Sequence, residues 1–205
     1  MILYGASGHA KVIIEILEQQ CIPITNLIDA NTNIKTLLGY PVLNKISPDC
    51  NDEFIISIGN NAVRKKLATE ISQTFGRAIH PSAVISPRCE IGVGTAVMAS
   101  VAINSGTCVG NHVILNTNCV VDHDCKIDDF VHISPNAALA GNVTVGQGTH
   151  IGMGSCIIQG RKIGKWCVIG AGAVIIRDMP DFAVAVGNPG KIIKYNQSEK
   201  YIYES

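Results

Sequence analysis

An aliphatic residue stands at every sixth position from Ile85 to Ile175, and this register never shifts. The apolar positions of an amphipathic helix would drift from such a spacing, because a helix repeats every 3.6 residues, and those of a half-buried strand would recur at every second residue. A strict six-residue period is typical of a parallel β-helix, in which each coil stacks on the one before and buries a ladder of like side chains. The ladder positions are Ile85, Ile91, Val97, Ile103, Val109, Leu115, Val121, Ile127, Ile133, Leu139, Val145, Ile151, Ile157, Ile163, Ile169 and Ile175.

A second pattern follows three residues after each ladder position. Gly, Asn and Asp are the commonest residues there, and they tolerate a positive φ angle better than others, as sharp corners require. Six residues per side and three sides per coil predict a little over five triangular coils between about residues 82 and 180. These corner residues are Gly94, Gly106, Asn118, Asp124, Asn136, Asn142, Gly148, Gly154, Gly160, Gly172 and Asp178.

The first part of the chain predicts alternating strands and helices. Residues 1–4, 24–28 and 54–58 are short apolar runs that predict strands. A helical apolar pattern follows the first run, and a helix bearing Arg64 follows the third. This alternation indicates a small parallel sheet.

The two patterns divide the chain. His80-Pro81 closes the first segment, because the residue before a proline disfavours helix. We expect a Rossmann-like α/β domain over residues 1–79, a β-helix over residues 80–180, and a C-terminal turn and tail over residues 181–205. The expected fold class is therefore mainly β.

Composition excludes several classes of partner. The formal net charge is zero and charged residues make up 16% of the 205, so we expect neither nucleic acid nor a membrane surface as a partner. The longest apolar stretches are far too short to span a bilayer. The first residues lack a basic stretch followed by an apolar one, so we expect no signal peptide and a cytoplasmic location.

The eight cysteines do not indicate a metal site or disulfides. No C-x-x-C pair occurs, and two of the eight, Cys21 and Cys50, lie in the first segment. Four others stand two residues before a ladder position, where Ala, Thr, Val or Ser stand in most other hexads, so we expect them to be small core fillers. These four are Cys89, Cys119, Cys125 and Cys167.

The first candidate site is the turn Gly5-Ala6-Ser7-Gly8-His9 between a predicted strand and a predicted helix. Backbone N–H groups there, with the helix dipole, could hold a phosphate or diphosphate. The full G-x-G-x-x-G pattern is absent. Asp29 ends the next strand, where its carboxylate could accept hydrogen bonds from a ribose or a base. The alternative is a plain structural turn.

The second candidate site is Asp122-His123-Asp124, at a predicted corner. A neutral imidazole that projects outward there could act as a general base, with a neighbouring carboxylate to fix its tautomer. The alternative makes His123 a surface residue and Asp124 a corner filler. Gly141 comes 18 residues after His123, hence one coil further on, and its missing side chain would leave room for a ligand.

His132 and His150 are also 18 residues apart and should lie one above the other on an outer face. With His123, they motivate a rival hypothesis, a β-helical zinc hydratase of the carbonic anhydrase type. Metal sites need ligands that converge on one point, and this spacing does not supply that convergence. A polar surface column is the simpler interpretation.

Taken together, these repeats and motifs resemble those of the NeuD-type hexapeptide-repeat sugar acyltransferases. Within them, the chain is most similar to the UDP-4-amino-4,6-dideoxy-sugar N-acetyltransferases of bacillosamine-type pathways. The likeness covers nearly the whole chain. It rests on Gly5–Lys11, Ile58–Asn60, His80–Ala83, Asn116-Thr117 with Asp122–Cys125, and Gly187–Gly190.

The resemblance implies a left-handed β-helix and a homotrimer with active sites between neighbouring subunits. It also implies acetyl-CoA as co-substrate, lying along the outer face of the coils, and no metal. His123 would be the base that deprotonates the sugar amine, and Asp124 would orient it. The family often has Glu after this histidine, whereas this chain has the shorter Asp.

The resemblance also implies where the substrates bind. Gly8 and His9 would meet the diphosphate of a UDP-sugar, and Asp29 would lie near the uracil or ribose. Backbone N–H groups near Gly141 could stabilise the oxyanion. Asn60 and Asn116 would line the sugar nucleotide pocket, while His132, Gly141 and Asn142 would border the pantetheine of acetyl-CoA, with Pro189 near its adenine.

Other functions remain open at this stage. Within the same class, the chain could O-acetylate sialic acid or N-acetylate a GDP-amino-sugar, for glycan biosynthesis in each case. Outside it, the zinc hydratase and a non-catalytic scaffold are the rivals.

Overall fold

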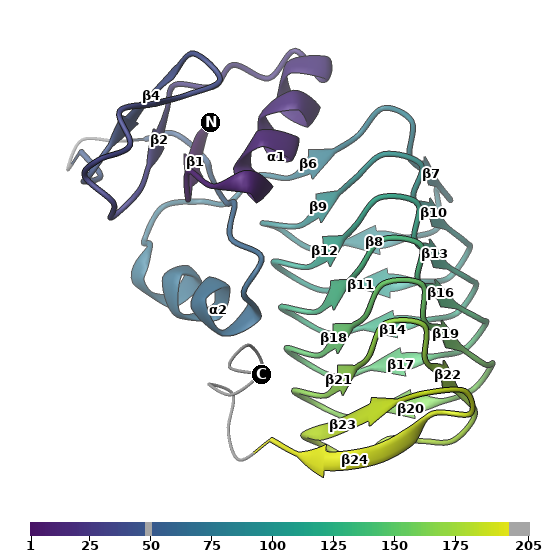
Figure 1. The fold of residues 1–205 in the computed structure, drawn as a ribbon. Coiled ribbons are helices and arrows are strands. Elements are labelled where there is room, and N and C mark those ends of the chain that lie inside the picture. Colours follow the sequence, from purple (N-terminus) through teal and green to yellow (C-terminus); the bar gives the residue numbers. More distant parts are fainter. Residues whose placement is uncertain (48–50, 197–205) are drawn as a thin grey trace.

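The computed structural model describes residues 1–47 and 51–196. Figure 1 shows a rod of stacked coils with a small α/β unit packed against the side of its first coils. We call residues 1–76 the head and residues 78–186 the rod. The expected parallel β-helix behind a small α/β unit is confirmed.

The head contains a five-stranded sheet in the order β3-β4-β2-β1-β5. Its central strands β1, β2 and β5 are parallel, as the alternating pattern predicts. The hairpin of β3 and β4 was missed by the sequence prediction, because its strands are short and largely exposed. Its Leu38-Gly39 turn has positive φ at both residues, which is typical of tight hairpins. The elements are β1 (Ile2–Tyr4), α1 (Gly8–Gln19), β2 (Asn26–Ile28), β3 (Thr36–Leu37), β4 (Tyr40–Leu43), β5 (Phe54–Ile56) and α2 (Asn61–Glu70).

The rod has three faces, each a sheet whose strands follow one another at 18-residue intervals up to β22. Face 1 consists of β6 (Ala78–Ile79), β9 (Ala96–Val97), β12 (Ile114–Leu115), β15 (His132–Ile133), β18 (His150–Ile151), β21 (Val168–Ile169), β23 (Ala183–Val186) and β24 (Lys191–Tyr195). Face 2 consists of β7 (Val84–Ile85), β10 (Ala102–Ile103), β13 (Val120–Val121), β16 (Ala138–Leu139), β19 (Cys156–Ile157) and β22 (Val174–Ile175). Face 3 consists of β8 (Glu90–Ile91), β11 (Cys108–Val109), β14 (Lys126–Ile127), β17 (Thr144–Val145) and β20 (Lys162–Ile163).

The ladder residues fill the interior of the rod. All of them from Val97 to Ile175 are buried, and the two that precede them, Ile85 and Ile91, are half-buried in the first coil. The coils advance in the left-handed sense (Figure 1). The segment after Pro180, for which we expect only a turn and a tail, contains β23 and β24, which extend face 1 over the last coil.

Positive φ angles occur at more corners than the Gly, Asn and Asp positions predicted from the sequence. Positive φ occurs at the predicted Gly, Asn and Asp corners from Gly94 to Gly172, but also at Ser100, His112, Phe130 and Trp166. Stacking therefore imposes this conformation even where the side chain disfavours it.

A hydrophobic cluster separate from the interior of the rod joins the head to the outer side of face 1. Helix α1 lies between the head sheet and the first coils of face 1, where Ile13 and Leu17 belong to the same buried cluster as Ala96 and Ile114. Helix α2 docks on the corner between faces 3 and 1, where the Asn61 amide donates a hydrogen bond of 3.0 Å to the Gly148 carbonyl. The head is thus fixed beside face 1.

Candidate active site

His123 and Asp124 form a hydrogen-bonded pair at the corner between faces 2 and 3. The His123 Nδ1 atom lies 2.8 Å from Asp124 Oδ2. Sequence neighbours in an extended strand point to opposite sides, but Asp124 has a φ of 58°, which turns its carboxylate toward the ring. Both side chains project outward, with exposed fractions of 58% and 67%. The Asp in place of the family's common Glu therefore still pairs with the histidine.

Two glycines provide the space for this pair. An added Cβ on Gly141 would lie 2.5 Å from His123 Nε2, so the imidazole rests on the next coil where that side chain is missing. An added Cβ on Gly106 would lie 2.5 Å from Asp124 Oδ1 in the same way. The predicted stacking of His123 and Gly141 is confirmed, and the ring itself occupies the space expected for a ligand.

Asp122 supports the pair from the other side. Its Oδ1 accepts hydrogen bonds from the His123 backbone N–H at 2.8 Å and from the Asn104 amide at 2.7 Å. Asn104 was not among the sequence-predicted site residues. Its 18-residue spacing from Asp122, which places the two in one column, is the signal that could have found it.

The electrostatics favour His123 as a base. The hydrogen bond to Asp124 raises the pKa of His123 above its usual 6.5, and the negative charge of Asp122 adds to this effect. A neutral imidazole with Nδ1–H donated to a carboxylate leaves Nε2 with a lone pair that can accept a proton.

This arrangement predicts a pH profile. A general base acts in its neutral form, so with His123 as the base kcat/KM should rise with pH through the raised pKa of His123 and level off above it. Asp124→Asn removes the charge that raises this pKa, so we expect the acid limb of the profile to move to lower pH and the plateau to fall. Rates of both proteins from about pH 5 to about pH 9 test this, because the same amine substrate titrates identically in both. An acid limb at the same pH in both proteins would contradict the predicted shift.

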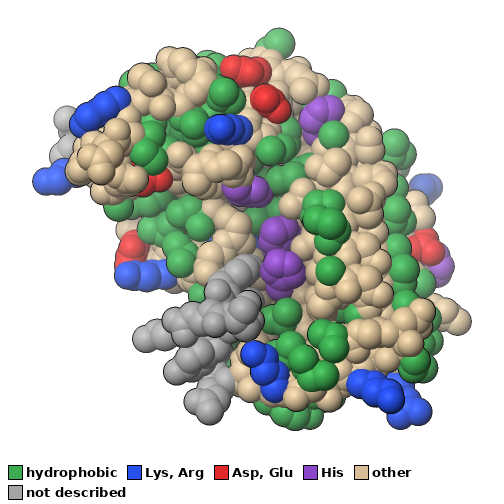
Figure 2. Space-filling model, viewed as in Figure 1, with side chains coloured by type: hydrophobic (Ala, Val, Ile, Leu, Met, Phe, Trp, Pro, Cys, Tyr) green, Lys and Arg blue, Asp and Glu red, His purple; other side chains and the backbone are tan. Residues whose placement is uncertain are grey.

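A second group of polar side chains lies where the head meets face 1, and Figure 2 shows histidines gathered there. The Asn116 amide donates to His132 Nε2 at 3.1 Å, and His150 Nε2 lies 2.9 Å from Ser134 Oγ. The rings of His132 and His150 stack with centroids 4.9 Å apart, as their spacing predicts. His9, on the first turn of α1, is close enough that its charge would lower the pKa of His132.

These head-side histidines are neutral at neutral pH. Burial, followed by the positive charge of Arg64, lowers the pKa of His9 and of His150 to about 4. Burial also holds the pKa of His132 well below 6.5, although the Gly59 backbone slightly opposes this. Neutral imidazoles of low pKa are poor bases but serve as hydrogen-bonding groups. The two groups of histidines therefore suit different roles.

The glycine turn is in direct contact with Asp29. The Ala6 N–H donates to Asp29 Oδ2 at 2.7 Å, so the carboxylate holds the turn in shape. No atom would lie within 4 Å of a Cβ on Gly8, which leaves the first turn of α1 open at this point. Asn60 caps α2 by accepting the Val63 N–H at 2.9 Å.

The predicted site residues fall into two groups that lie apart within one chain. One group lies at the corner between faces 2 and 3, and the other lies in the head and beside face 1. The turn that holds Pro189 sits at the end of face 2, where the Gly190 N–H donates to the Val174 carbonyl at 2.8 Å. The first group is His123, Asp124, Gly141 and Asn142, and the second is Gly8, His9, Asp29, Asn60, Asn116 and His132.

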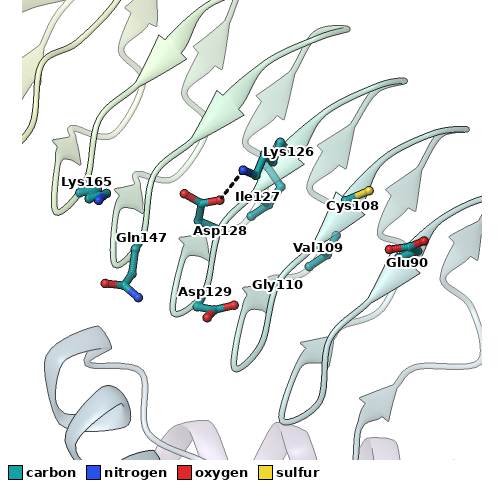
Figure 3. A pocket seen from close by; sticks show the side chains of 10 residues that line it. All are labelled: Glu90, Cys108, Val109, Gly110, Lys126, Ile127, Asp128, Asp129, Gln147 and Lys165. Carbon is teal, nitrogen blue, oxygen red and sulfur yellow. Dashed lines mark ion pairs between the residues drawn. The ribbon is translucent and has the colours of Figure 1, made fainter.

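A groove of about 450 Å³ crosses the outer side of face 3 (Figure 3). It contains none of the predicted site residues. Its charges are mixed, and Lys126 Nζ lies 3.7 Å from Asp128 Oδ1 within it. The groove extends toward the corner where α2 docks, away from His123.

The geometry does not favour the zinc hypothesis. Within residues 1–47 and 51–196, no group of three His, Cys, Asp or Glu side chains is placed to hold a metal ion. His123 lies on a different corner from the stacked His132 and His150. Cys119, Cys125 and Cys167 are buried as the expected core fillers, whereas Cys50 lies outside the described residues.

Known proteins share both parts of this architecture. Residues 1–71 match the PglD N-terminal domain, and residues 142–177 match the bacterial transferase hexapeptide (six repeats). A histidine mutant of perosamine N-acetyltransferase from Caulobacter crescentus, in complex with CoA and GDP-perosamine, is 38% identical, with a TM-score of 0.88 over 94% of this chain and 96% of that chain. The chain belongs to the PglD-type family of sugar N-acetyltransferases. The resemblance inferred from the sequence is thereby confirmed.

Two further proteins that are similar to this chain are also acetyltransferases. The acetyltransferase domain of PglB from Neisseria gonorrhoeae, in complex with acetyl coenzyme A, is 36% identical, with a TM-score of 0.87 over 94% of this chain and 98% of that chain. UDP-N-acetylbacillosamine N-acetyltransferase from Bacillus subtilis is 37% identical over 112 residues, which cover 47% of this chain and 50% of the relative. The chain spans at most half the length of the first curated relatives that it matches. Neither helix in the described part of this family member is long and apolar enough to cross a membrane.

Proposed function

We propose that this protein transfers the acetyl group of acetyl-CoA to the 4-amino group of a UDP-linked amino-dideoxy sugar in glycan biosynthesis, within the cytoplasm. The observation that carries this proposal is the outward-facing pair of His123 and Asp124, whose hydrogen bond of 2.8 Å raises the pKa of the ring. Family membership supplies the reaction class. A GDP-linked amino sugar is the second candidate, because the perosamine enzyme of similar fold binds GDP-perosamine.

In the proposed step, the sugar amine attacks the thioester carbon and a C–N bond forms. His123 Nε2 accepts the proton that the amine loses, and Asp124 stabilises the resulting imidazolium through Nδ1–H. Backbone N–H groups near Gly141 lie beside the ring and are candidates to stabilise the oxyanion. The C–S bond then breaks, and CoA leaves as the thiol once it regains the proton.

Acetyl-CoA would extend along the corner between faces 2 and 3. Continuing at 18-residue intervals from His123, the column contains Gly141, Gln159 and Arg177. Three coils at a strand spacing of about 4.8 Å span roughly 14 Å, and this distance suits a pantetheine arm. Asn142 lies beside the arm, and the turn of Pro189 lies at its far end for the adenine.

The nucleotide sugar would bind between the head and face 1. Gly8 and His9 at the start of α1 are candidates for the diphosphate, and Asp29 lies beside this turn for the nucleoside. Neutral His132 and its partner Asn116 offer hydrogen bonds to the sugar. Asn60 enters the same region from the start of α2.

Packing of several copies through face 2 would bring the two separated groups of site residues into one site. Its outward residues are small and apolar, and Val84 and Val120 are 72% and 39% exposed. His123 lies along one edge of this face and Asn116 along the other. If three copies pack through face 2 about a threefold axis, His123 of one copy meets the head side of the next. We therefore propose a homotrimer with three shared sites. The outward residues of face 2 are Val84, Ala102, Val120, Ala138, Cys156 and Val174.

Thiol release tests the proposed function. We expect free CoA thiol, detected with DTNB, when the protein meets acetyl-CoA and a UDP-4-amino-4,6-dideoxy sugar. The GDP-linked amino sugar and CMP-sialic acid serve as parallel substrates, and mass spectrometry locates the added acetyl group. Thiol release with only the GDP-linked sugar would show that the nucleotide of the substrate is GDP and not UDP. A trimeric, folded protein that releases no thiol with any of them would refute acetyl transfer, and zinc analysis of the same sample tests the hydratase.

A further inference from the structure

Arg64 of α2 is a buried cation at the joint between the head and the rod. Only 1% of its surface is exposed. Its Nε donates to the His112 carbonyl at 2.8 Å, and its Nη2 donates to the Phe130 carbonyl at 2.9 Å. His112 and Phe130 are successive corners between faces 3 and 1, so one guanidinium ties two neighbouring coils together.

The same guanidinium also holds the loop that precedes α2. Its Nη1 donates to the carbonyls of Ile58 at 3.0 Å and Gly59 at 3.1 Å, and its Nη2 donates to Asn61 Oδ1 at 2.9 Å. Five hydrogen bonds thus connect one planar group to the loop just before it and to two corners that are distant in sequence. A lysine has a single ammonium group and cannot reproduce this fork.

These contacts fix the parts from which the proposed sugar-nucleotide pocket is built. The Ile58-Gly59 loop leads directly into Asn60. The corner at Phe130 leads into β15, which begins with His132, and the corner at His112 leads into β12, which ends beside Asn116. Each residue that Arg64 contacts is therefore only one to four residues away in sequence from a residue of the proposed pocket.

We propose that Arg64 is a positioning residue that sets the Ile58–Asn60 loop against His132 and Asn116 for recognition of the nucleotide sugar. This inference rests on the proposed function. Arg64 contacts neither His123 nor the corner along which acetyl-CoA would lie, so its effect should be confined to the sugar substrate. Its charge also helps to keep the neighbouring histidines neutral, as hydrogen-bonding groups must be to both donate and accept.

The test compares Arg64→Lys, which keeps the charge, with Arg64→Gln, which removes it. In either variant that folds as a trimer, we expect KM for the nucleotide sugar to rise about tenfold or more, with kcat and KM for acetyl-CoA within about twofold of wild type. Lys65→Met is the matched control. Lys65 is the next residue of α2 and packs over Trp166 at the same corner, with Nζ 5.0 Å from the ring centroid.

The outcomes separate positioning from stability. A tenfold rise in sugar KM that Lys65→Met does not share supports the proposal. Equal effects of Arg64→Lys and Lys65→Met, or equal changes in both KM values, would show that Arg64 only docks the helix. Failure of both Arg64 variants to fold would likewise assign Arg64 to docking alone. If the wild-type protein releases no thiol in this assay, the proposed function has failed; if it does and the KM values do not split, only the role of Arg64 has failed.

Discussion

Replacing His123 with alanine should lower kcat by about 10²–10⁴-fold and leave the fold and the trimer unchanged. The imidazole of His123 has a raised pKa and an Nε2 lone pair that can accept a proton, and the carboxylate of Asp124 cannot replace it because it supports the ring rather than the substrate. The side chain is exposed, so its loss removes little packing. Initial rates at saturating acetyl-CoA and nucleotide sugar measure the effect.

His80→Ala is the matched control for this prediction. His80 is a half-buried histidine of the first coil, and its Nδ1 accepts the Ser82 N–H at 3.0 Å. We expect this variant to keep wild-type kcat within about twofold, because the ring lies outside the corner site. A His123→Ala protein with a similarly small loss would mean that the amine needs no protein base.

The sequence was sufficient to predict the rod because its period is set by local stacking. Each ladder residue packs on residues 18 positions before and after it, so the pattern repeats without interruption. The same rule predicted that His123 stacks with Gly141 and that His132 stacks with His150. It also predicted the positive φ of Asp124, on which the pairing with His123 depends.

The sequence did not reveal what holds the head to the rod. The sequence predicted only that Arg64 lies on a helix, and the residue is buried because α2 docks on a corner whose residues are far away in sequence. The corner pattern consists of Gly, Asn and Asp, but the bulky residues Phe130 and Trp166 occupy two of the corners. Both lie where α2 packs. Non-local contacts of this kind leave no periodic signal.

The resemblance grouped His132 with the acetyl-CoA site, and within one chain its ring is hydrogen-bonded to Asn116 on the head side. Spacing along the chain gives the face on which a residue lies but not which residues of another copy it meets. The proposed trimer would reunite His132 of one subunit with His123 of the next. In the proposed trimer the arrangement of the site would depend on assembly, and this dependence yields a strong prediction.

Val120→Glu should convert the proposed trimer to monomers and lower activity to about the level of His123→Ala, a loss of about 10²–10⁴-fold. Val120 is an outward residue near the middle of face 2, and a carboxylate there would be buried without a partner at the threefold contact. Monomers keep His123 and the head but hold them on opposite edges of face 2. Sedimentation and rate measurements on the same sample test both effects.

Lys126→Glu separates the effect of assembly from that of added charge. Lys126 is the outward residue of the next strand in the same coil, on the polar face 3, and its side chain is 70% exposed. Because face 3 lies outside the proposed contact, this variant should stay trimeric and active. A Val120→Glu protein that remains a fully active trimer would place the contact elsewhere, and an active monomer would show that one chain completes its own site. Loss of assembly with loss of rate only in Val120→Glu would support the shared site, because the catalytic histidine itself is intact in that variant.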